Sequence, residues 1–504
     1  MITEAVYKPS SLPIYQGNPL IEALPDYLTY RTPAIREKLR KEPIKLAGQA
    51  NRRQCFAWLM SLNKALFIEL PRHLQLQEMI DVIIRQGYHH RKPIGAERAK
   101  ALQAAYERLQ SGDATAMANF GHDVQDPLSV SVVGCSGIGK TTAITRILSM
   151  YPQVLHHPAY RLGAETLQVT YLKVECPHDG SVKSLCTNII RELDKITGQD
   201  YESAYIKSRS TLETIKSRMI HLMAVHYVGL LVIDEIQNLT VNKKNKNELF
   251  NFIVSLANTL AVPILYVGTP KIIEFMTSDL RIGRRFGSIG AIRWNHLSRN
   301  AKEWDYLISK LWEFNVFKSP SRVMPEEIEA AFYEYSQGII DVLIKLFILT
   351  QMDALVRNLK GFEVERIRAV YETYFQSVDP MITALRKNDI LALEKYQDIA
   401  MVNKDYNNAL DAMADELLNA TADESTGDIS GETPGPSYQM LFERLGIALT
   451  PELEQALNDP GENLDELLGR AMRLHFAGDR QEETHPQEKQ SQTTEVKAAQ
   501  GNLV

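Results

Sequence analysis

The sequence predicts an α/β fold, in which a parallel sheet sandwiched by helices is joined to helical regions before and after it. Short β-branched or apolar runs alternate with amphipathic helical patterns between residues 126 and 299, and this alternation is typical of parallel sheets. A glycine-rich segment, Gly134–Thr141, directly follows the first of these runs. Strand, glycine-rich turn and helix in this order predict a phosphate-binding core.

The charge of the chain is unevenly distributed. The 504 residues carry a net charge of −6, and 44% of them are apolar. Residues 411–504 contain 19 acidic and 6 basic residues, which leaves +7 on residues 1–410. We therefore expect a basic globular body and an acidic tail.

Cysteines and hydropathy exclude several classes of protein. The four cysteines are scattered and form no CxxC pair, which excludes a disulfide scaffold and favours a reducing, cytoplasmic setting. The N-terminus shows no secretory signal pattern, and the longest apolar stretch, residues 338–350, is interrupted by Asp341 and Lys345. We expect no membrane span.

Changes in composition divide the chain into seven predicted segments. Six prolines before residue 45 predict an extended arm that reaches toward a partner, and residues 421–437 are rich in small, acidic and turn-forming residues. The predicted segments are an extended N-terminal arm (1–50), a helical N-terminal domain (51–125), an αβα core (126–299), a helical lid (300–410), an acidic linker (411–437), a small helical docking module (438–477) and a disordered tail (478–504).

Periodicity places the elements within these segments. The N-terminal domain is expected to contain helices between residues 52 and 86, broken at Pro71, and at residues 96–109. In the core, predicted strands at residues 128–133, 167–174, 229–233 and 263–267 alternate with predicted helices at residues 141–150, 184–197, 210–226 and 247–260.

The strongest chemical signal is the G-x4-G-K-[ST] pattern of the P-loop. Its glycines let backbone N–H groups face phosphates, the following helix adds its positive dipole end, Lys140 reaches the β- and γ-phosphates, and Thr141 binds Mg²⁺. A chance glycine-rich turn is the alternative. The expected nucleotide-binding residues are Gly134, Ser136, Gly137, Ile138, Gly139, Lys140, Thr141 and Thr142.

Two acids end the apolar run at residues 230–233. Asp234 is aimed at the Mg²⁺ shell, while Glu235 can polarise an attacking water. A strand that simply runs into an acidic turn is the alternative. Because these acids follow a P-loop by about ninety residues, with strand and helix units between, they predict ATP hydrolysis.

Two further segments supply candidate catalytic residues. Thr269 follows the strand at residues 263–267, where its hydroxyl could sense the γ-phosphate, although a plain turn is the alternative. Arg281, Arg284 and Arg285 lie within five positions, and Arg284 and Arg285 are candidate arginine fingers. The alternative for these arginines is a solvated or DNA-facing patch.

Five segments together resemble the TnsC/TniB family of AAA+ transposition regulators, and are closest to TnsC. They are the P-loop, DEIQNL at Asp234–Leu239, VGTP at Val267–Pro270, RRFG at Arg284–Gly287 and SQGIIDVLIKLF at Ser336–Phe347. The resemblance implies an AAA+ core with ATP and Mg²⁺, in which Lys140 and Thr141 hold the Walker A positions, Asp234 and Glu235 Walker B, Thr269 sensor 1, and Arg284 or Arg285 the finger. Asp341 stands where many AAA+ proteins have a sensor 2 arginine.

The resemblance also implies a function. It implies a bacterial, cytoplasmic ATPase that assembles as a ring or filament on double-stranded target DNA, links a TnsD- or TniQ-like target selector to TnsA- and TnsB-like transposase subunits, and is dismantled by hydrolysis. Two alternatives stay open: a replication-initiator or helicase-loader-like ATPase, and a signalling or secretion-linked scaffold that acts without DNA.

Contact with DNA must depend on basic side chains, because the sequence has no zinc-finger or RNP pattern. Each basic group taken alone could instead be a solvated face, and repetition along an oligomer would multiply weak phosphate contacts. The candidates are Lys183, Arg191, Lys207, Arg209, Lys216, Lys243 and Lys244.

The predicted docking module contains four leucines at helical spacing, Leu441, Leu445, Leu449 and Leu453. They form an amphipathic face for a partner helix or for a self-packed mini-domain.

Overall fold

The computed structural model divides the chain into two compact units, Met1–Thr421 and Ala422–Val504. This boundary falls within the predicted linker at residues 411–437. All residues that the structure describes belong to the first unit. They are residues 2–27, 32–41, 46, 50–89, 91, 93, 128–162, 165–206, 210–240, 252, 262–273, 290–317, 322–387, 406–414 and 416.

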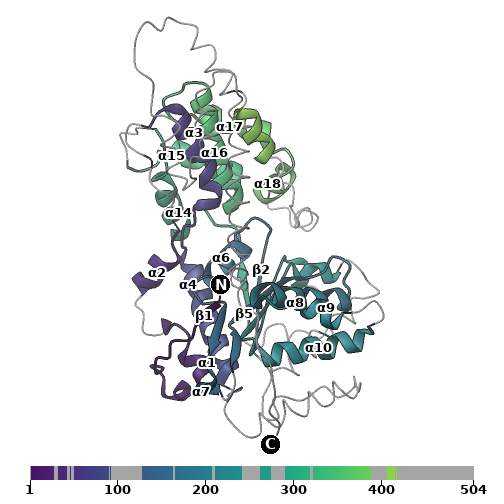
Figure 1. Cartoon of the computed structure of the whole chain (residues 1–504). Helices are drawn as coiled ribbons and strands as arrows, with labels where there is room; N and C mark the ends of the chain where they lie inside the picture. Colours follow the sequence, from purple (N-terminus) through teal and green to yellow (C-terminus); the bar gives the residue numbers. More distant parts are fainter. Residues whose placement is uncertain are drawn as a thin grey trace, which may run out of the picture. The chain divides into compact units, whose positions relative to one another are not determined.

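A five-stranded sheet with the order β5-β6-β7-β2-β8 forms the centre of the core (Figure 1), and all its strand pairs are parallel. This confirms the predicted α/β fold with a parallel sheet. Residues of β2, β6 and β7 are buried along their whole length. The strands are β2 (Ser129–Gly134), β5 (Tyr171–Glu175), β6 (Leu230–Asp234), β7 (Ile264–Gly268) and β8 (Ala291–Trp294).

Two hydrophobic clusters cover the two faces of this sheet. In β6, Leu230 and Val232 belong to one cluster, whereas Leu231 and Ile233 belong to the other. Successive side chains of a strand point to opposite faces, so a strand with helices on both sides must be apolar throughout. The covering helices are α4 (Pro71–His89) and α6 (Lys140–Leu148) in the first cluster, and α8 (Val182–Thr197) and α10 (Leu212–Val225) in the second.

The predicted strand at residues 167–174 is wrong, because the chain forms two strands there. β4 (Thr166–Val169) ends before Thr170, and β5 begins at Tyr171. β4 pairs antiparallel with β3 (Val154–His157) in a separate sheet of three strands, β1-β3-β4, while β5 pairs with β6. The segment therefore changes from one sheet to the other at a single residue, Thr170. β8, an exposed edge strand, had no prediction.

The predicted extended arm is also wrong for residues 2–27. β1 (Ile2–Glu4) pairs parallel with β3, and the side chains of Leu20 and Ile21 are at most 1% exposed. Pro13 and Pro19 begin the helices η1 (Pro13–Tyr15) and α1 (Pro19–Glu22). The N–H of the first helical residue has no partner within the helix, so a proline, which lacks this N–H, is tolerated there. Residues 2–27 therefore form a packed segment, which we call the N-terminal strap, and its prolines begin short helices.

The predicted N-terminal helices do not form a domain of their own. Helix α3 (Arg52–Ala65) packs against α16 (Ile340–Val356) of the lid, where Arg52 Nη2 donates to Leu355 O at 2.7 Å. Helix α4, which begins at Pro71 as predicted, packs against α6 and β6 instead. The chain therefore crosses from the lid to the core at residues 66–70.

A second crossing runs from the core back to the lid between β8 and α14 (Lys302–Trp312). Arg72 at the start of α4 joins the two crossings: its Nη2 lies 2.6 Å from Glu303 Oε2 in α14, and its Nη1 donates to Asn295 O at 3.0 Å. The lid continues with α15 (Glu326–Ser336), α16, α17 (Val364–Tyr374) and α18 (Asp379–Arg386).

Helix α16 accounts for the longest apolar stretch of the sequence. Its residues from Val342 to Val356 are buried except Ile344, because α3, α15 and α17 all pack against it. No helix among the described residues is long and apolar enough to cross a membrane.

Several predicted segments lie outside the described residues, apart from Phe252. They are the predicted helices at 96–109 and 247–260 and the segments 438–477 and 478–504. The remaining short elements are α2 (Thr32–Leu39), α7 (Ala159–Leu162), α9 (Tyr201–Tyr205) and η3 (Ile236–Thr240).

Candidate active site

The P-loop turns from the end of β2 into the start of α6. Gly137 and Gly139 have φ values of +76° and +89°, a left-handed conformation that L side chains rarely adopt. Gly134 is needed for another reason, since a Cβ there would lie 2.5 Å from Trp294 O in β8. The turn thus leaves the first N–H groups of α6 free of side-chain cover, as an anion site requires.

Lys140, the first residue of α6, folds its side chain back over the loop. Its Nζ donates to Gly134 O at 2.7 Å and to Cys135 O at 2.9 Å, and the residue is 8% exposed. A buried ammonium held by carbonyl oxygens can exchange them for phosphate oxygens when an anion enters the loop.

Thr141 and Asp234 meet between the start of α6 and the end of β6. Thr141 Oγ1 donates to Asp234 Oδ2 at 3.0 Å, and Asp234 is 2% exposed. Hydroxyl and carboxylate oxygens are the hard donors that Mg²⁺ prefers. The pair therefore fits the ion that the sequence predicts, with Thr141 and Asp234 as the residues that would hold it.

Lys173 of β5 is a member of this site that the sequence analysis did not identify. Its Nζ lies 3.3 Å from Asp234 Oδ2 and donates to Thr145 Oγ1 at 3.1 Å. The only sequence signal was the alternation of Tyr171, Lys173 and Glu175 with buried residues in β5. A lysine thus places a positive charge beside the buried carboxylate.

Glu235 leaves β6 with φ +54°, outside the conformations that glutamate usually adopts. Its N–H donates to Asp234 Oδ1 at 3.0 Å, and its Oε2 accepts a hydrogen bond from Gln237 Nε2 in η3. The sharp turn directs two consecutive carboxylates in different directions from one strand end. One can hold a cation while the other can polarise a water molecule.

Thr269 follows β7 at the same edge of the sheet. The residue is 3% exposed, and within the described part of the chain its Oγ1 has no hydrogen-bond partner. A buried hydroxyl without a partner is costly and requires an explanation, such as a missing ligand. The position fits the predicted contact with a γ-phosphate.

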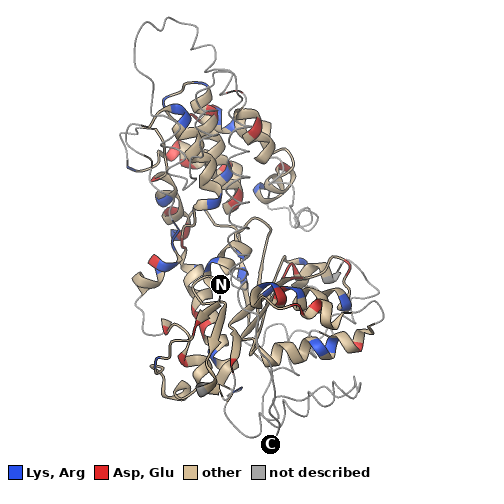
Figure 2. Ribbon diagram, viewed as in Figure 1, with Lys and Arg blue, Asp and Glu red and all other residues tan. Residues whose placement is uncertain are grey.

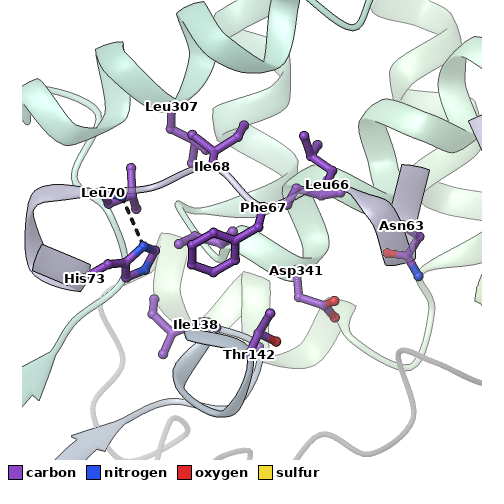
Figure 3. Close-up of a pocket in the computed structure, with 14 residues that line it drawn as sticks. Asn63, Leu66, Phe67, Ile68, Leu70, His73, Ile138, Thr142, Leu307 and Asp341 are labelled. Atoms are coloured by element: carbon purple, nitrogen blue, oxygen red, sulfur yellow. Dashed lines mark hydrogen bonds between the residues drawn. The ribbon is translucent and has the colours of Figure 1, made fainter. Parts of the chain in front are cut away.

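A cavity of about 110 Å³ lies beside the P-loop. In Figure 3, the ring of Phe67 faces Ile138 and Thr142 of the P-loop, and Leu307 and Asp341 come from the lid. Its walls come from three parts of the chain that are remote in sequence, so periodicity could not predict it. The lining residues are Asn63, Leu66, Phe67, Ile68, Leu70, His73, Gly137, Ile138, Gly139, Thr142, Leu307, Ile340, Asp341 and Ile344.

His73 forms part of the wall of this cavity in a neutral state. Its Nδ1 accepts a hydrogen bond from the Leu70 N–H at 3.1 Å. Burial, with a smaller contribution from the charge of Arg72, lowers the pKa of His73 to about 3. The cavity therefore carries no positive charge from His73 at neutral pH.

Asp341 at the start of α16 joins the lid to the P-loop through its backbone. Its N–H donates to Gly137 O at 3.0 Å, and its Oδ2 lies 2.6 Å from Nζ of the buried Lys345. The lid therefore contacts the P-loop through Asp341, the residue that stands where many AAA+ proteins have a sensor 2 arginine.

The described candidates for DNA contact are mostly paired with acids. Arg191 Nη2 lies 2.7 Å from Glu202 Oε1, and Lys216 Nζ lies 2.9 Å from Glu213 Oε1. Figure 2 shows basic and acidic residues interleaved on α8 and α10. Lys183 is exposed near the start of α8. The other predicted residues, Lys207, Arg209, Lys243, Lys244, Arg284 and Arg285, lie outside the described residues.

The sheet order, the P-loop and the acids at the end of β6 define a P-loop NTPase fold of the AAA+ class. A family model described as an AAA domain matches residues 123–276 and so covers the P-loop, Asp234, Glu235 and Thr269. The chain thus carries an AAA domain. No curated protein matches the sequence.

Three of the solved structures that match this chain are those of two ORC proteins and one DnaA domain. The Aeropyrum pernix ORC1 protein in complex with DNA is 15% identical, with 76% of this chain and 84% of that chain covered and a TM-score of 0.36. Drosophila ORC bound to DNA is 11% identical, with coverages of 82% and 90% and a TM-score of 0.39. Domain III of Thermotoga maritima DnaA is 13% identical, with coverages of 56% and 94% and a TM-score of 0.31. At these identities the likeness concerns the fold alone.

Proposed function

We propose that the protein is an ATP-dependent, DNA-binding regulator of DNA transposition that oligomerises on target DNA and links a target-selection protein to the transposase. The observation that carries the ATP-dependent part is the convergence of Thr141, Asp234 and the unpartnered hydroxyl of Thr269 at one sheet edge. The transposition part rests on the resemblance of five segments between Gly134 and Phe347 to the TnsC/TniB family.

In this proposal, ATP lies along the P-loop with its base in the cavity beside it. The apolar side chains of Phe67, Ile138 and Leu307 exclude water from the base, and the phosphates face the start of α6. Mg²⁺ held by Thr141 and Asp234 would neutralise phosphate charge. Lys140 then moves from its carbonyl partners to the phosphate oxygens.

Hydrolysis dismantles the oligomer in this proposal. Glu235 polarises the attacking water, Thr269 contacts the γ-phosphate, and Arg284 or Arg285 of a neighbouring subunit stabilises the charge of the transition state. Each site then needs two subunits, so ATP binding favours assembly and hydrolysis reverses it.

DNA contact in this proposal is directed at the phosphate backbone and tolerates any sequence. Lys183 and the candidates at 207, 209, 243 and 244 supply weak contacts that repeat along an oligomer. Arg191 and Lys216 are weaker candidates, since Glu202 and Glu213 already neutralise them. The acidic tail is repelled by DNA and stays free for a target selector of the TnsD or TniQ kind and for TnsA- and TnsB-like subunits.

The test is electron microscopy of the full chain on duplex DNA with a slowly hydrolysed ATP analogue. We expect regular oligomers with the analogue and none with ADP. Failure to form nucleotide-dependent oligomers would reject the proposal. ATP turnover that ignores duplex DNA would instead favour a scaffold without a DNA role. A neighbouring gene for a transposase would separate the transposition regulator from a replication initiator or helicase loader.

A further inference from the structure

The side-chain amide of Gln237 joins two groups of the candidate active site. Its Nε2 donates to Glu235 Oε2, while its Oε1 accepts from the Thr269 N–H at 3.1 Å. Gln237 lies in η3, directly after the two acids of β6, and is 3% exposed. One buried amide therefore spans from the carboxylate of Glu235 to the end of β7.

The orientation of this amide follows from its partners. The Thr269 N–H can only donate, so the Gln237 oxygen must face it, and the NH₂ group must then face Glu235. A reversed amide would place two donors together at Thr269 and two acceptors together at Glu235. Gln237 is thus fixed as the donor to the carboxylate.

The helix η3 packs closely against the ends of two strands. A Cβ at Gly268 would lie 2.6 Å from Ile236 Cγ2 and 2.9 Å from Gln237 Oε1, so η3 sits directly against the end of β7. On the other side of β6, Asn238 Nδ2 donates to Cys176 O at 3.0 Å, at the end of β5. The short helix η3 is fastened to both strands that flank β6.

We propose that Gln237 is a positioning residue for Glu235, and that it ties the orientation of this carboxylate to the position of Thr269. The inference rests on the proposed ATP hydrolysis, and it adds that the position of Thr269 regulates the orientation of the general base in that site. Thr269 presents a buried hydroxyl to an incoming phosphate while its N–H holds Gln237. A shift of Thr269 toward a bound phosphate therefore moves the amide that orients Glu235.

The chemistry explains why a donor is needed at this place. Glu235 follows the end of β6 with a left-handed φ, and its Oε2 accepts a hydrogen bond from Gln237 Nε2. A general base must lie within hydrogen-bond reach of the water that it polarises, and small displacements cost rate rather than affinity. Gln237 supplies one hydrogen bond that fixes the position of Oε2 of this carboxylate.

Three variants of the full chain test this inference. Gln237→Leu keeps the approximate shape and removes both hydrogen bonds, whereas Gln237→Glu keeps an acceptor for the Thr269 N–H and cannot donate to Glu235 as a carboxylate. Asn238→Ala is the matched control, because it removes the side-chain bond of the same short helix to Cys176 O and keeps the backbone bond from the Asn238 N–H to Glu235 O. The measurements are kcat and KM for ATP with Mg²⁺ and duplex DNA, together with the midpoint of thermal unfolding.

We expect Gln237→Leu and Gln237→Glu each to lower kcat about tenfold with KM within about twofold of wild type. Asn238→Ala should lower the unfolding midpoint at least as much as Gln237→Leu but keep kcat within about twofold. Equal losses of kcat in Gln237→Leu and Asn238→Ala would overturn the inference, as would wild-type or raised kcat in Gln237→Glu. A wild-type chain that hydrolyses no ATP would instead reject the proposed function itself.

Discussion

Lys173 reaches the carboxylate of Asp234 from the neighbouring strand, with Nζ 3.3 Å from Oδ2. The Asp234 side chain is only 3% exposed, so its charge depends on partners within the protein. Lys173 supplies a positive charge at the place where Thr141 and Asp234 would hold Mg²⁺. The lysine and a bound Mg²⁺ would therefore compensate the charge of the same carboxylate.

The first prediction concerns this shared compensation. Lys173→Met should lower the free energy of unfolding by about 2 kcal/mol without Mg²⁺, because it leaves a buried charge with one partner fewer. Added Mg²⁺ and ADP should reduce that loss, since a bound ion would then compensate the charge of Asp234. Urea unfolding with and without Mg²⁺ and ADP measures both effects. Lys183→Met, an exposed lysine, is the matched control, and an Mg²⁺-independent loss at Lys173 would contradict the prediction.

The second prediction separates nucleotide binding from hydrolysis. Lys140→Ala should prevent ATP binding and assembly on DNA, because the cation that reaches the phosphates is lost. Glu235→Gln should still bind ATP, lower kcat by about a hundredfold and accumulate oligomers on DNA. Nucleotide binding, ATP turnover and electron microscopy give the three readouts. If both variants assembled like the wild type, ATP would not be the switch.

The third prediction concerns His73 and pH. Its pKa is about 3 in the folded protein because of burial, against about 6.5 when the chain is unfolded. The unfolded chain therefore binds the extra proton, and stability should fall on acidification below pH 6.5 by about 1.4 kcal/mol per unit from this residue.

His73→Asn tests this assignment, because its side-chain oxygen can still accept from Leu70 N–H but cannot ionise near neutrality. Urea unfolding between pH 7 and pH 5 should give a shallower slope in the variant, by a difference that approaches one proton at pH 5. The variant loses packing volume, so the comparison uses slopes and not absolute stabilities. Identical slopes in the two proteins would show that His73 does not contribute.

The fourth prediction tests the packed N-terminal strap. Leu20→Ala should destabilise the protein by about 3 kcal/mol, because it empties a fully buried position. Val6→Ala, in the same strap but 67% exposed, should change stability by less than about 0.5 kcal/mol. Chemical denaturation of both variants gives the comparison. A free arm would leave both variants as stable as the wild type.

The fifth prediction concerns the acidic end of the chain. Removal of residues 422–504 should preserve ATP-dependent DNA binding, because it removes acidic charge and leaves the unit Met1–Thr421 intact. The same deletion should abolish recruitment of the transposase. Gel shift and pull-down with purified transposase measure the two properties. Loss of DNA binding in the truncated chain would show that the tail does more than dock partners.

Local patterns were enough to predict the P-loop, its strand and helix, and the two acids of β6. These features depend on neighbours in sequence, since the periodicity of β6 and the glycine spacing of the loop are both local. The pairing of Thr141 with Asp234 also follows, because the carboxyl ends of parallel strands share one edge of the sheet.

Long-range packing explains what the sequence did not predict. Lys173 meets Asp234 only through the pairing of β5 with β6, and the cavity needs Phe67, Ile138 and Leu307 from three separate regions. The break at Thr170 is hidden because polar and apolar residues alternate in both flanking strands and no glycine or proline separates them. Proline content was misleading at the N-terminus, since Pro13 and Pro19 start helices of a packed segment.

The ion pair between Arg72 and Glu303 has a mechanical consequence. It holds together the two places where the chain passes between core and lid, at residues 66–70 and at residues 295–301. The two passages between core and lid are therefore fixed to each other by one side chain, Arg72. The cavity beside the P-loop is lined by Leu66 and Leu70 at the first crossing, so it lies next to this junction. A ligand in this cavity would therefore contact core and lid side chains at the place where both passages of the chain are fixed.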